Sequence, residues 1–169
     1  MSDRRLSEAS QVGPGHPDLE GPCGICDLHG DAQAMARSEI HRQGDWVLRH
    51  HPHPAPMLGW LLLDTRRHLG GPIDFNPVEA ATFGPMLKRC SALVQILTGC
   101  QRVYVIAFGE GARHLHAHLI PRHGADPSSE AWRVADLYRQ VAAQGRSAAS
   151  PAEVAQLVAR ARECTASWR

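Results

Sequence analysis

Aromatic residues are scarce in this chain of 169 residues, which has only two tyrosines, three phenylalanines and four tryptophans. Long hydrophobic runs are also missing. The longest uninterrupted apolar stretch, residues 59–63, is far too short to cross a bilayer. The first ten residues, MSDRRLSEAS, carry charges without an apolar core, so no secretory signal is expected. We therefore expect a cytoplasmic protein with no membrane partner.

An excess of charge of either sign is absent as well. Eighteen basic and seventeen acidic side chains give a formal net charge of +1, which argues against a nucleic-acid partner. Five cysteines, an odd number, do not suggest the disulfide framework of a secreted protein. What the chain does have is eleven histidines. Because histidine is the commonest metal ligand and the usual acid or base near neutral pH, their arrangement is the place to look for function.

The chain divides into three parts by composition. Residues 1–20 are polar and rich in Gly, Pro and Ser, and we expect a flexible N-terminal arm. Residues 21–124 hold the segments that alternate or repeat like strands and helices, and form the main domain. Residues 125–169 are expected to be a C-terminal helical extension, with one helix over 128–144 and a second beginning near residue 150.

Within the main domain the pattern predicts several short strands and one long helix. The expected strands cover residues 38–43, 46–50, 59–64, 103–108 and 114–120. The helix begins after Asn76, which can cap it together with Glu79, and ends at Gly99. Pro85 lies inside this helix, so a kink or a break is expected near Ala81.

Three histidines alternate with apolar residues in the run His114-Leu-His116-Ala-His118. In a strand this spacing places the three imidazoles on one face, about 7 Å apart along it. Such a row suits a metal site. It equally suits nucleophilic and acid–base chemistry, in which one imidazole attacks while its neighbours control tautomer and charge. Spacing alone does not separate these two hypotheses.

A second motif, Cys23-Gly-Ile-Cys26, is half of a possible zinc site, a possible redox pair, or chance. The surrounding sequence lacks the strand-then-helix context of a thioredoxin-like pair, which disfavours a redox-responsive module. Zinc needs two further ligands, and histidines are plentiful.

Together these motifs resemble the histidine triad (HIT) family of nucleotide-binding hydrolases and transferases. Residues 114–122, HLHAHLIPR, fit the family motif of three histidines alternating with apolar residues, and residues 59–68, GWLLLDTRRH, resemble its strand and basic segment. The early cysteine pair is similar to that of the zinc-binding branch, which includes diadenosine tetraphosphate hydrolases. The resemblance covers residues 21–124. It implies an α+β fold, in which an antiparallel sheet of about five strands carries a long helix on one face, and a homodimer.

The resemblance also implies roles for particular residues. His116 would attack the α-phosphorus of a nucleotide and form a nucleotidyl-histidine intermediate, while His118 would hydrogen-bond the phosphate oxygens. The backbone amides of Gly109 and Gly111, with Arg122 as a possible anion contact, would complete the phosphate site.

In zinc-binding members of the family, the ligands correspond to Cys23, Cys26, His68 and His114. A Cys₂His₂ set is a closed tetrahedral site and is typical of structural zinc. We therefore expect zinc as a structural cofactor that fastens the N-terminal segment to the histidine strand.

Two residues depart from the family pattern. Trp60 stands where a fourth histidine is usual, eight residues before His68, and Glu110 places an acid where an amide usually meets phosphate. These departures put the rate or the mechanism in doubt. Trp60 is interpreted as a core residue or a base-stacking one. His50, His51 and His53 adjoin a proline-rich loop, and two interpretations are open: they approach the nucleotide or a second metal, or they are solvated loop residues, which is the favoured interpretation.

The functional hypothesis is a nucleotide hydrolase or nucleotidyl transferase that acts at the α-phosphate, on dinucleoside polyphosphates such as diadenosine tetraphosphate. One alternative is an AMP-amidate (phosphoramidase-type) hydrolase. Another is a zinc-stabilised nucleotide-binding or scaffold protein with little or no turnover.

Overall fold

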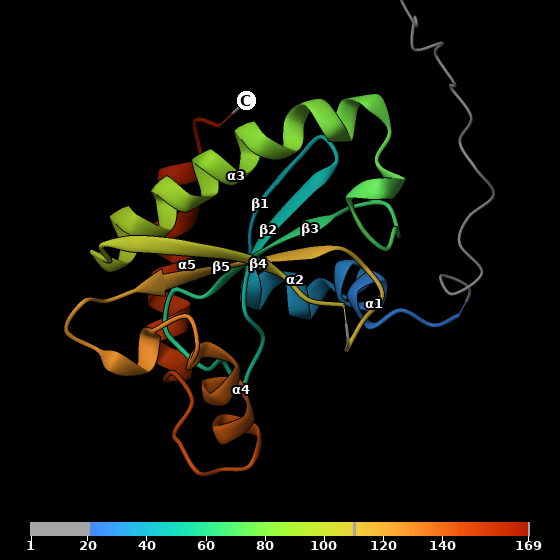
Figure 1. The fold of residues 1–169 in the computed structure, drawn as a ribbon. Helices are drawn as coiled ribbons and strands as arrows, with labels where there is room; N and C mark the ends of the chain where they lie inside the picture. The colour runs from blue at the N-terminus through green and yellow to red at the C-terminus, as the bar shows by residue number, and fades with distance from the viewer. Residues whose placement is uncertain (1–20, 110, 169) are drawn as a thin grey trace, which may run out of the picture.

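A computed structural model describes residues 21–109 and 111–168 of the chain. The expected N-terminal arm and Glu110 therefore lie outside the described residues. Five strands form one antiparallel sheet in the order β1-β2-β3-β5-β4 (Figure 1). They are β1 (Glu39–Gln43), β2 (Trp46–His50), β3 (Leu61–Thr65), β4 (Arg102–Ala107) and β5 (His116–Arg122). The predicted α+β class and the five-stranded sheet are confirmed.

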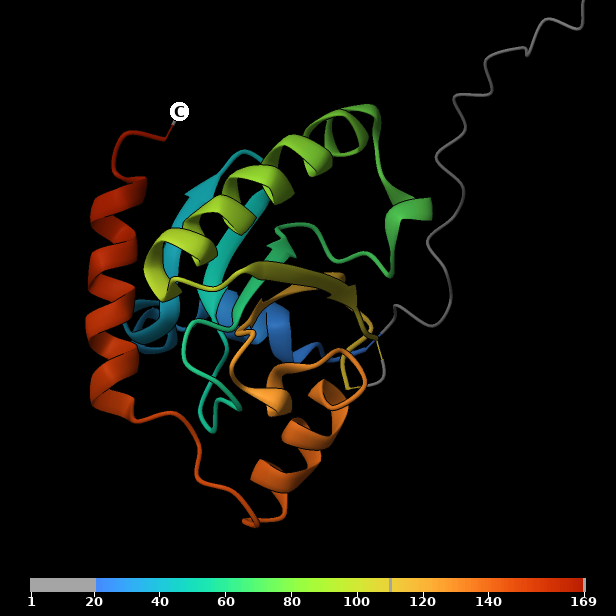
Figure 2. The same ribbon diagram turned by 60° about the vertical axis from the view of Figure 1, so that its left-hand side comes forward.

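The long helix α3 (Pro77–Thr98) covers one face of the sheet (Figures 1 and 2). Its start follows the predicted capping box, in which the Asn76 side chain accepts hydrogen bonds from the first turn and Glu79 accepts one from the Asn76 amide. The helix continues without interruption through Pro85, so a break is wrong, and the alternative expectation of a kink stays a prediction. Ala81 and Pro85 are both exposed, and water can therefore hydrogen-bond the carbonyl that the proline ring leaves unpaired.

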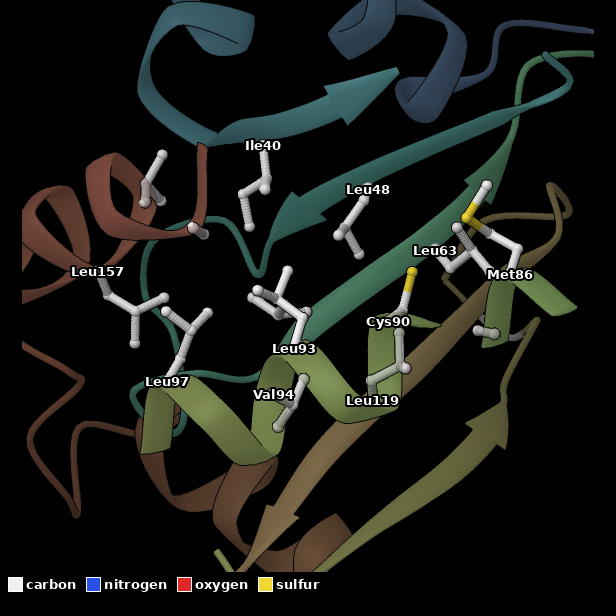
Figure 3. Packing of buried hydrophobic residues seen from close by; sticks show 14 of the residues in the cluster. Ile40, Leu48, Leu63, Met86, Cys90, Leu93, Val94, Leu97, Leu119 and Leu157 are labelled. Atoms are coloured by element: carbon white, nitrogen blue, oxygen red, sulfur yellow. The ribbon is translucent and has the colours of Figure 1, made fainter. Parts of the chain in front are cut away.

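The main core lies between α3 and this face of the sheet. Cys90, Leu93 and Val94 point from the helix toward Leu63 and Leu119 on the central strands (Figure 3). Side chains alternate along a strand, so packing these residues inward aims their neighbours at the opposite face. That second face carries the histidines.

The second face is covered by helices from both ends of the described chain. Two short helices, α1 (Gly24–Gly30) and α2 (Ala32–Ser38), precede the sheet, and α4 (Val134–Ala142) lies on the side away from α3 (Figure 2). The last helix, α5 (Pro151–Thr165), places Leu157, Val158 and Ala161 in the main core. Among the described helices, none combines the length and hydropathy needed to span a membrane.

Candidate active site and metal site

His116 and His118 begin β5 and lie on the face that α1 and α4 cover. The strand register sets Asp64 opposite His116 and Leu62 opposite His118, and the two imidazole rings are 5.0 Å apart. Both rings line a cavity of about 450 Å³ between the sheet and these helices. Aromatic side chains supply much of its wall: Trp60, Phe108 and Tyr138.

The His116 ring is oriented by the backbone of its own strand. Its Nδ1 lies 2.6 Å from the carbonyl oxygen of His114. Because a carbonyl can only accept, Nδ1 carries the proton and donates it. In the neutral ring Nε2 then keeps a lone pair. This is the tautomer that a histidine nucleophile requires.

His118 has the opposite tautomer, and Trp60 is the reason. The indole Nε1–H of Trp60, a pure donor, lies 2.9 Å from His118 Nδ1, so that nitrogen accepts and Nε2 carries the proton. Burial lowers the pKa of His118 to about 3, and the charges of nearby His116, His51 and Arg49 act in the same direction. His118 is therefore a neutral ring whose Nε2–H can serve as a donor.

His50 and His51 are buried, so the favoured interpretation of them as solvated loop residues is wrong. His50 is enclosed because its ring is built into the turn that follows β2: Nδ1–H donates to the His51 carbonyl, and Nε2 accepts from the Gly59 amide. His51 lines the cavity, with its ring 5.4 Å from that of Tyr138, and burial lowers its pKa to about 4. The sequence did indicate this burial, because residues 46–51, WVLRHH, form one strand-like run in which both histidines continue a buried strand.

Cys23, Cys26, His68 and His114 meet at one end of the histidine row. Nδ1 of His114 lies 3.4 Å from the sulfur of each cysteine. The His68 ring stacks on His114 with a centroid separation of 5.2 Å. Ligand atoms of Cys23, His68 and His114 all lie within 4.8 Å of one another. The four residues that the resemblance named are thus brought together.

The hydrogen bonds of this cluster fit a metal ion. His114 Nε2–H donates to the Thr65 carbonyl at 2.7 Å, which leaves Nδ1 unprotonated and facing the two sulfurs. A second-shell carbonyl of this kind commonly orients a metal-binding histidine. Burial and the neighbouring Cys23 sulfur raise the pKa of Cys26 to about 11, the opposite of the low pKa that a redox pair needs.

Of the predicted phosphate-binding residues, Gly111 lines the cavity, whereas Gly109 and Arg122 do not. Gly111 lines the cavity beside Phe108, and Gly109 is exposed in the same loop. Arg122 lies at the far end of β5 and is not among the cavity-lining residues. Its guanidinium donates to the Asp126 carbonyl and the Ser129 hydroxyl at 3.1 and 3.0 Å, which fixes the turn that leads into the C-terminal extension.

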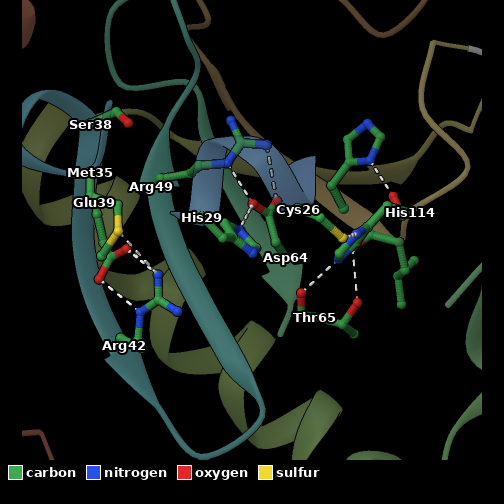
Figure 4. A network of polar contacts seen from close by, with 12 residues as sticks. Cys26, His29, Met35, Ser38, Glu39, Arg42, Arg49, Asp64, Thr65 and His114 are labelled. Atoms are coloured by element: carbon green, nitrogen blue, oxygen red, sulfur yellow. Dashed lines mark hydrogen bonds and ion pairs between the residues drawn. The ribbon is translucent and has the colours of Figure 1, made fainter. Parts of the chain in front are cut away.

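Sequence reasoning missed a buried charge cluster on the same face of the sheet. Asp64 is fully buried, and it accepts hydrogen bonds from Arg49 Nε at 2.5 Å, Arg49 Nη2 at 3.2 Å and His29 Nε2 at 2.9 Å (Figure 4). Burial would raise the pKa of Asp64, but Arg49 and His29 outweigh burial and hold the pKa below its usual value. The sequence did contain a sign of this cluster: Arg49 interrupts the apolar strand β2, and Asp64 interrupts the apolar strand β3.

Comparison with known proteins supports the fold. No protein-family model and no curated protein sequence matches the chain. Among solved structures, a zinc-bound histidine triad family protein from Mycobacterium smegmatis is similar over 87% of this chain and 97% of its own, with 17% identity and a TM-score of 0.60. A histidine triad protein from Bradyrhizobium japonicum is similar over 79% of this chain and 94% of its own, with 23% identity and a TM-score of 0.57. One from Sinorhizobium meliloti covers 79% of this chain and 93% of its own, with 21% identity and the same TM-score. The chain therefore has the fold of the histidine triad proteins.

Proposed function

We propose that the protein is a histidine triad enzyme that hydrolyses or transfers nucleotides at the α-phosphate. The observation that carries this proposal is the His116 tautomer. Its Nδ1–H is committed to the His114 carbonyl, and the ring therefore presents an unprotonated Nε2. The ring is half-buried and lines the cavity, as a nucleophile must.

In the proposed reaction, Nε2 of His116 attacks the α-phosphorus and the bond from phosphorus to the leaving group breaks. The nucleotide stays on the imidazole until water attacks the phosphorus and releases a nucleoside monophosphate. His118 donates its Nε2–H to a phosphate oxygen. Its low pKa keeps the ring neutral, so it supplies a hydrogen bond to the phosphate and does not take up a proton itself.

The aromatic wall of the cavity supports a nucleoside as the remainder of the substrate. Trp60 is buried, Tyr138 is half exposed, and both lie against His51. Flat apolar surfaces of this kind suit a base, while few polar groups fix its orientation. We propose dinucleoside polyphosphates such as diadenosine tetraphosphate as substrates, ahead of AMP-amidates.

We further propose that Cys23, Cys26, His68 and His114 hold a structural zinc ion. The ion would supply a cross-link between α1 and the start of β5. It would not enter the reaction, because four protein ligands close a tetrahedral site. Binding would add to the free energy of folding.

We also propose that the protein is a cytoplasmic homodimer. Apolar side chains exposed beside the sheet edge support the dimer. Val105 on the edge strand β4 is 45% exposed, and Ile96 on α3 is 67% exposed. Sedimentation velocity at two protein concentrations tests it, and a single species of monomer mass would contradict it.

The test of the function is turnover of diadenosine tetraphosphate and of an AMP-amidate by the wild type and by His116→Ala. We expect cleavage by the wild type, a mass-spectrometric nucleotidyl adduct on His116, and a loss of at least about 100-fold in the variant. His53→Ala is the matched control, since His53 is exposed and outside this cavity. Turnover that survives in His116→Ala would refute the mechanism. No turnover of either compound would favour a nucleotide-binding protein instead.

A further inference from the structure

Two buried side-chain nitrogens in the described part of the chain have no hydrogen-bond partner, Arg49 Nη1 and His118 Nε2. The residues come from different strands, β2 and β5, yet both line the same cavity. A buried donor left unpaired costs about 1–3 kcal/mol, and more when it is charged. Two such donors in the wall of one cavity are the groups that bind an anion.

The Arg49 side chain is held so that only one of its edges is free. Asp64 accepts from Nε and Nη2, which fixes the plane of the guanidinium and leaves Nη1 on the far side (Figure 4). His29 fixes the carboxylate in turn, and the side chain of Asp64 is wholly buried. A guanidinium oriented in advance loses little conformational entropy when it binds a ligand.

The strand register places Arg49 on the same face of the sheet as the histidine pair, with Leu62 of β3 between Arg49 and His118. Asp64, which holds it, is the direct cross-strand neighbour of His116. Arg49 lies opposite Leu62, which lies opposite His118, so Arg49 and His118 share one row and one face of the sheet. The charge of Arg49 also acts on His118, whose pKa it helps to lower. One neutral donor and one cationic donor therefore belong to residues that line the same cavity.

We propose that Arg49 and His118 together bind the phosphate group of the ligand, with Arg49 Nη1 as the cationic contact that separates nucleotides from uncharged nucleosides. This inference rests on the proposed function, since the phosphate is the one that His116 attacks. Both nitrogens are shielded from bulk water, so a phosphate oxygen reaches them as the side chains of the cavity wall adjust around it.

The test compares binding of AMP and of adenosine by isothermal titration calorimetry. Removing Arg49 alone would leave the Asp64 carboxylate buried without its arginine partner. The variant is therefore Arg49→Met with Asp64→Asn, whose amide oxygen still accepts from His29. The matched control is Arg42→Met with Glu39→Gln. This control also removes an ion pair with two hydrogen bonds, from Arg42 Nε and Nη2 to the Glu39 carboxylate at 3.1 and 2.7 Å. The pair lies outside the cavity. Each double variant leaves the net charge unchanged.

We expect the wild type and the control to bind AMP more tightly than adenosine. The Arg49 variant should lose about 10- to 100-fold in AMP affinity, the range for a hydrogen bond to a charged group, with adenosine affinity within twofold. An AMP preference that persists in the Arg49 variant overturns this inference and leaves the proposed function intact. A wild type that does not prefer AMP overturns both.

A measurement on the unaltered protein covers the case in which the Arg49 variant does not fold. In nitrogen-15 spectra of the arginine side chains, AMP should shift the Arg49 guanidinium resonances and adenosine should not. Arg49→Lys, which keeps the charge, identifies the resonance. A guanidinium signal that does not respond to AMP contradicts the inference.

Discussion

The hydrogen bond from Trp60 to His118 gives the sharpest test of how this site is set. The change is Trp60→Phe, which keeps an aromatic ring and removes the N–H that lies 2.9 Å from His118 Nδ1. Both side chains are buried, at 1% and 5% exposure, so no water replaces the lost donor. The His118 ring should then redistribute between its two tautomers.

The expected size of the effect follows from these contacts. A net hydrogen bond of about 1 kcal/mol biases the tautomer about fivefold, and an unpaired buried nitrogen costs about 1–3 kcal/mol. The smaller ring leaves a cavity that costs about 1–2 kcal/mol more. The free energy of unfolding should therefore fall by about 2–5 kcal/mol, and turnover by about fivefold or more.

Nitrogen-15 spectra of the histidine rings provide the assay, because they distinguish protonated from unprotonated ring nitrogens without requiring activity. In the wild type, His118 should show a protonated Nε2 and an unprotonated Nδ1. Its pKa of about 3 means that this pattern should persist down to about pH 4. Trp46→Phe is the matched control, since the Trp46 indole is equally buried and donates to Thr82 at 2.9 Å on the opposite face of the sheet.

The control should be destabilised by packing loss and leave the His118 signals unchanged. A wild-type His118 that carries its proton on Nδ1, or titrates near the ordinary value of 6.5, would refute the reasoning. Unchanged His118 signals in Trp60→Phe would refute it as well.

Three further predictions concern stability and the metal site. Gly59 has a φ of +79°, and a Cβ there would lie 2.3 Å from a threonine methyl of α3, so Gly59→Ala should lower the free energy of unfolding by about 2–5 kcal/mol in urea denaturation. Gly99→Ala shares the positive φ but has open space, so it should lose only about 1–2 kcal/mol, and equal losses would contradict the clash. Elemental analysis should find one zinc ion per chain and a sharp decrease in Cys23→Ser; a wild type that folds stably without metal would rule out the structural role. For Glu79, burial raises the pKa, but hydrogen bonds from Arg67 and a backbone amide outweigh it and lower the pKa below the ordinary value of 4.5. Stability from this carboxylate is therefore complete above about pH 4.5 and lost as the pH falls further, so Glu79→Gln should flatten that acidic loss, and a parallel curve would contradict it.

Local patterns in the sequence determined much of the fold. The capping residues around Asn76 marked the start of α3, and alternation predicted the strands to within about two residues, because both signals depend on neighbours along the chain. The same alternation identified the histidine row, since a period of two fixes which side chains share a face.

Tertiary structure alone decided how the site is tuned. Trp60 and His118 are 58 residues apart, and His29 and Asp64 are 35 apart, so no local pattern pairs them. The sequence showed only that a tryptophan stands at position 60; the fold shows that its indole N–H donates a hydrogen bond to His118. In the same way, the fold buries His51 in the wall of the cavity. It places Arg122 at the far end of β5, outside the cavity. The sequence determines which groups the chain can offer, whereas tautomer, burial and pairing depend on contacts that form only when distant strands come together.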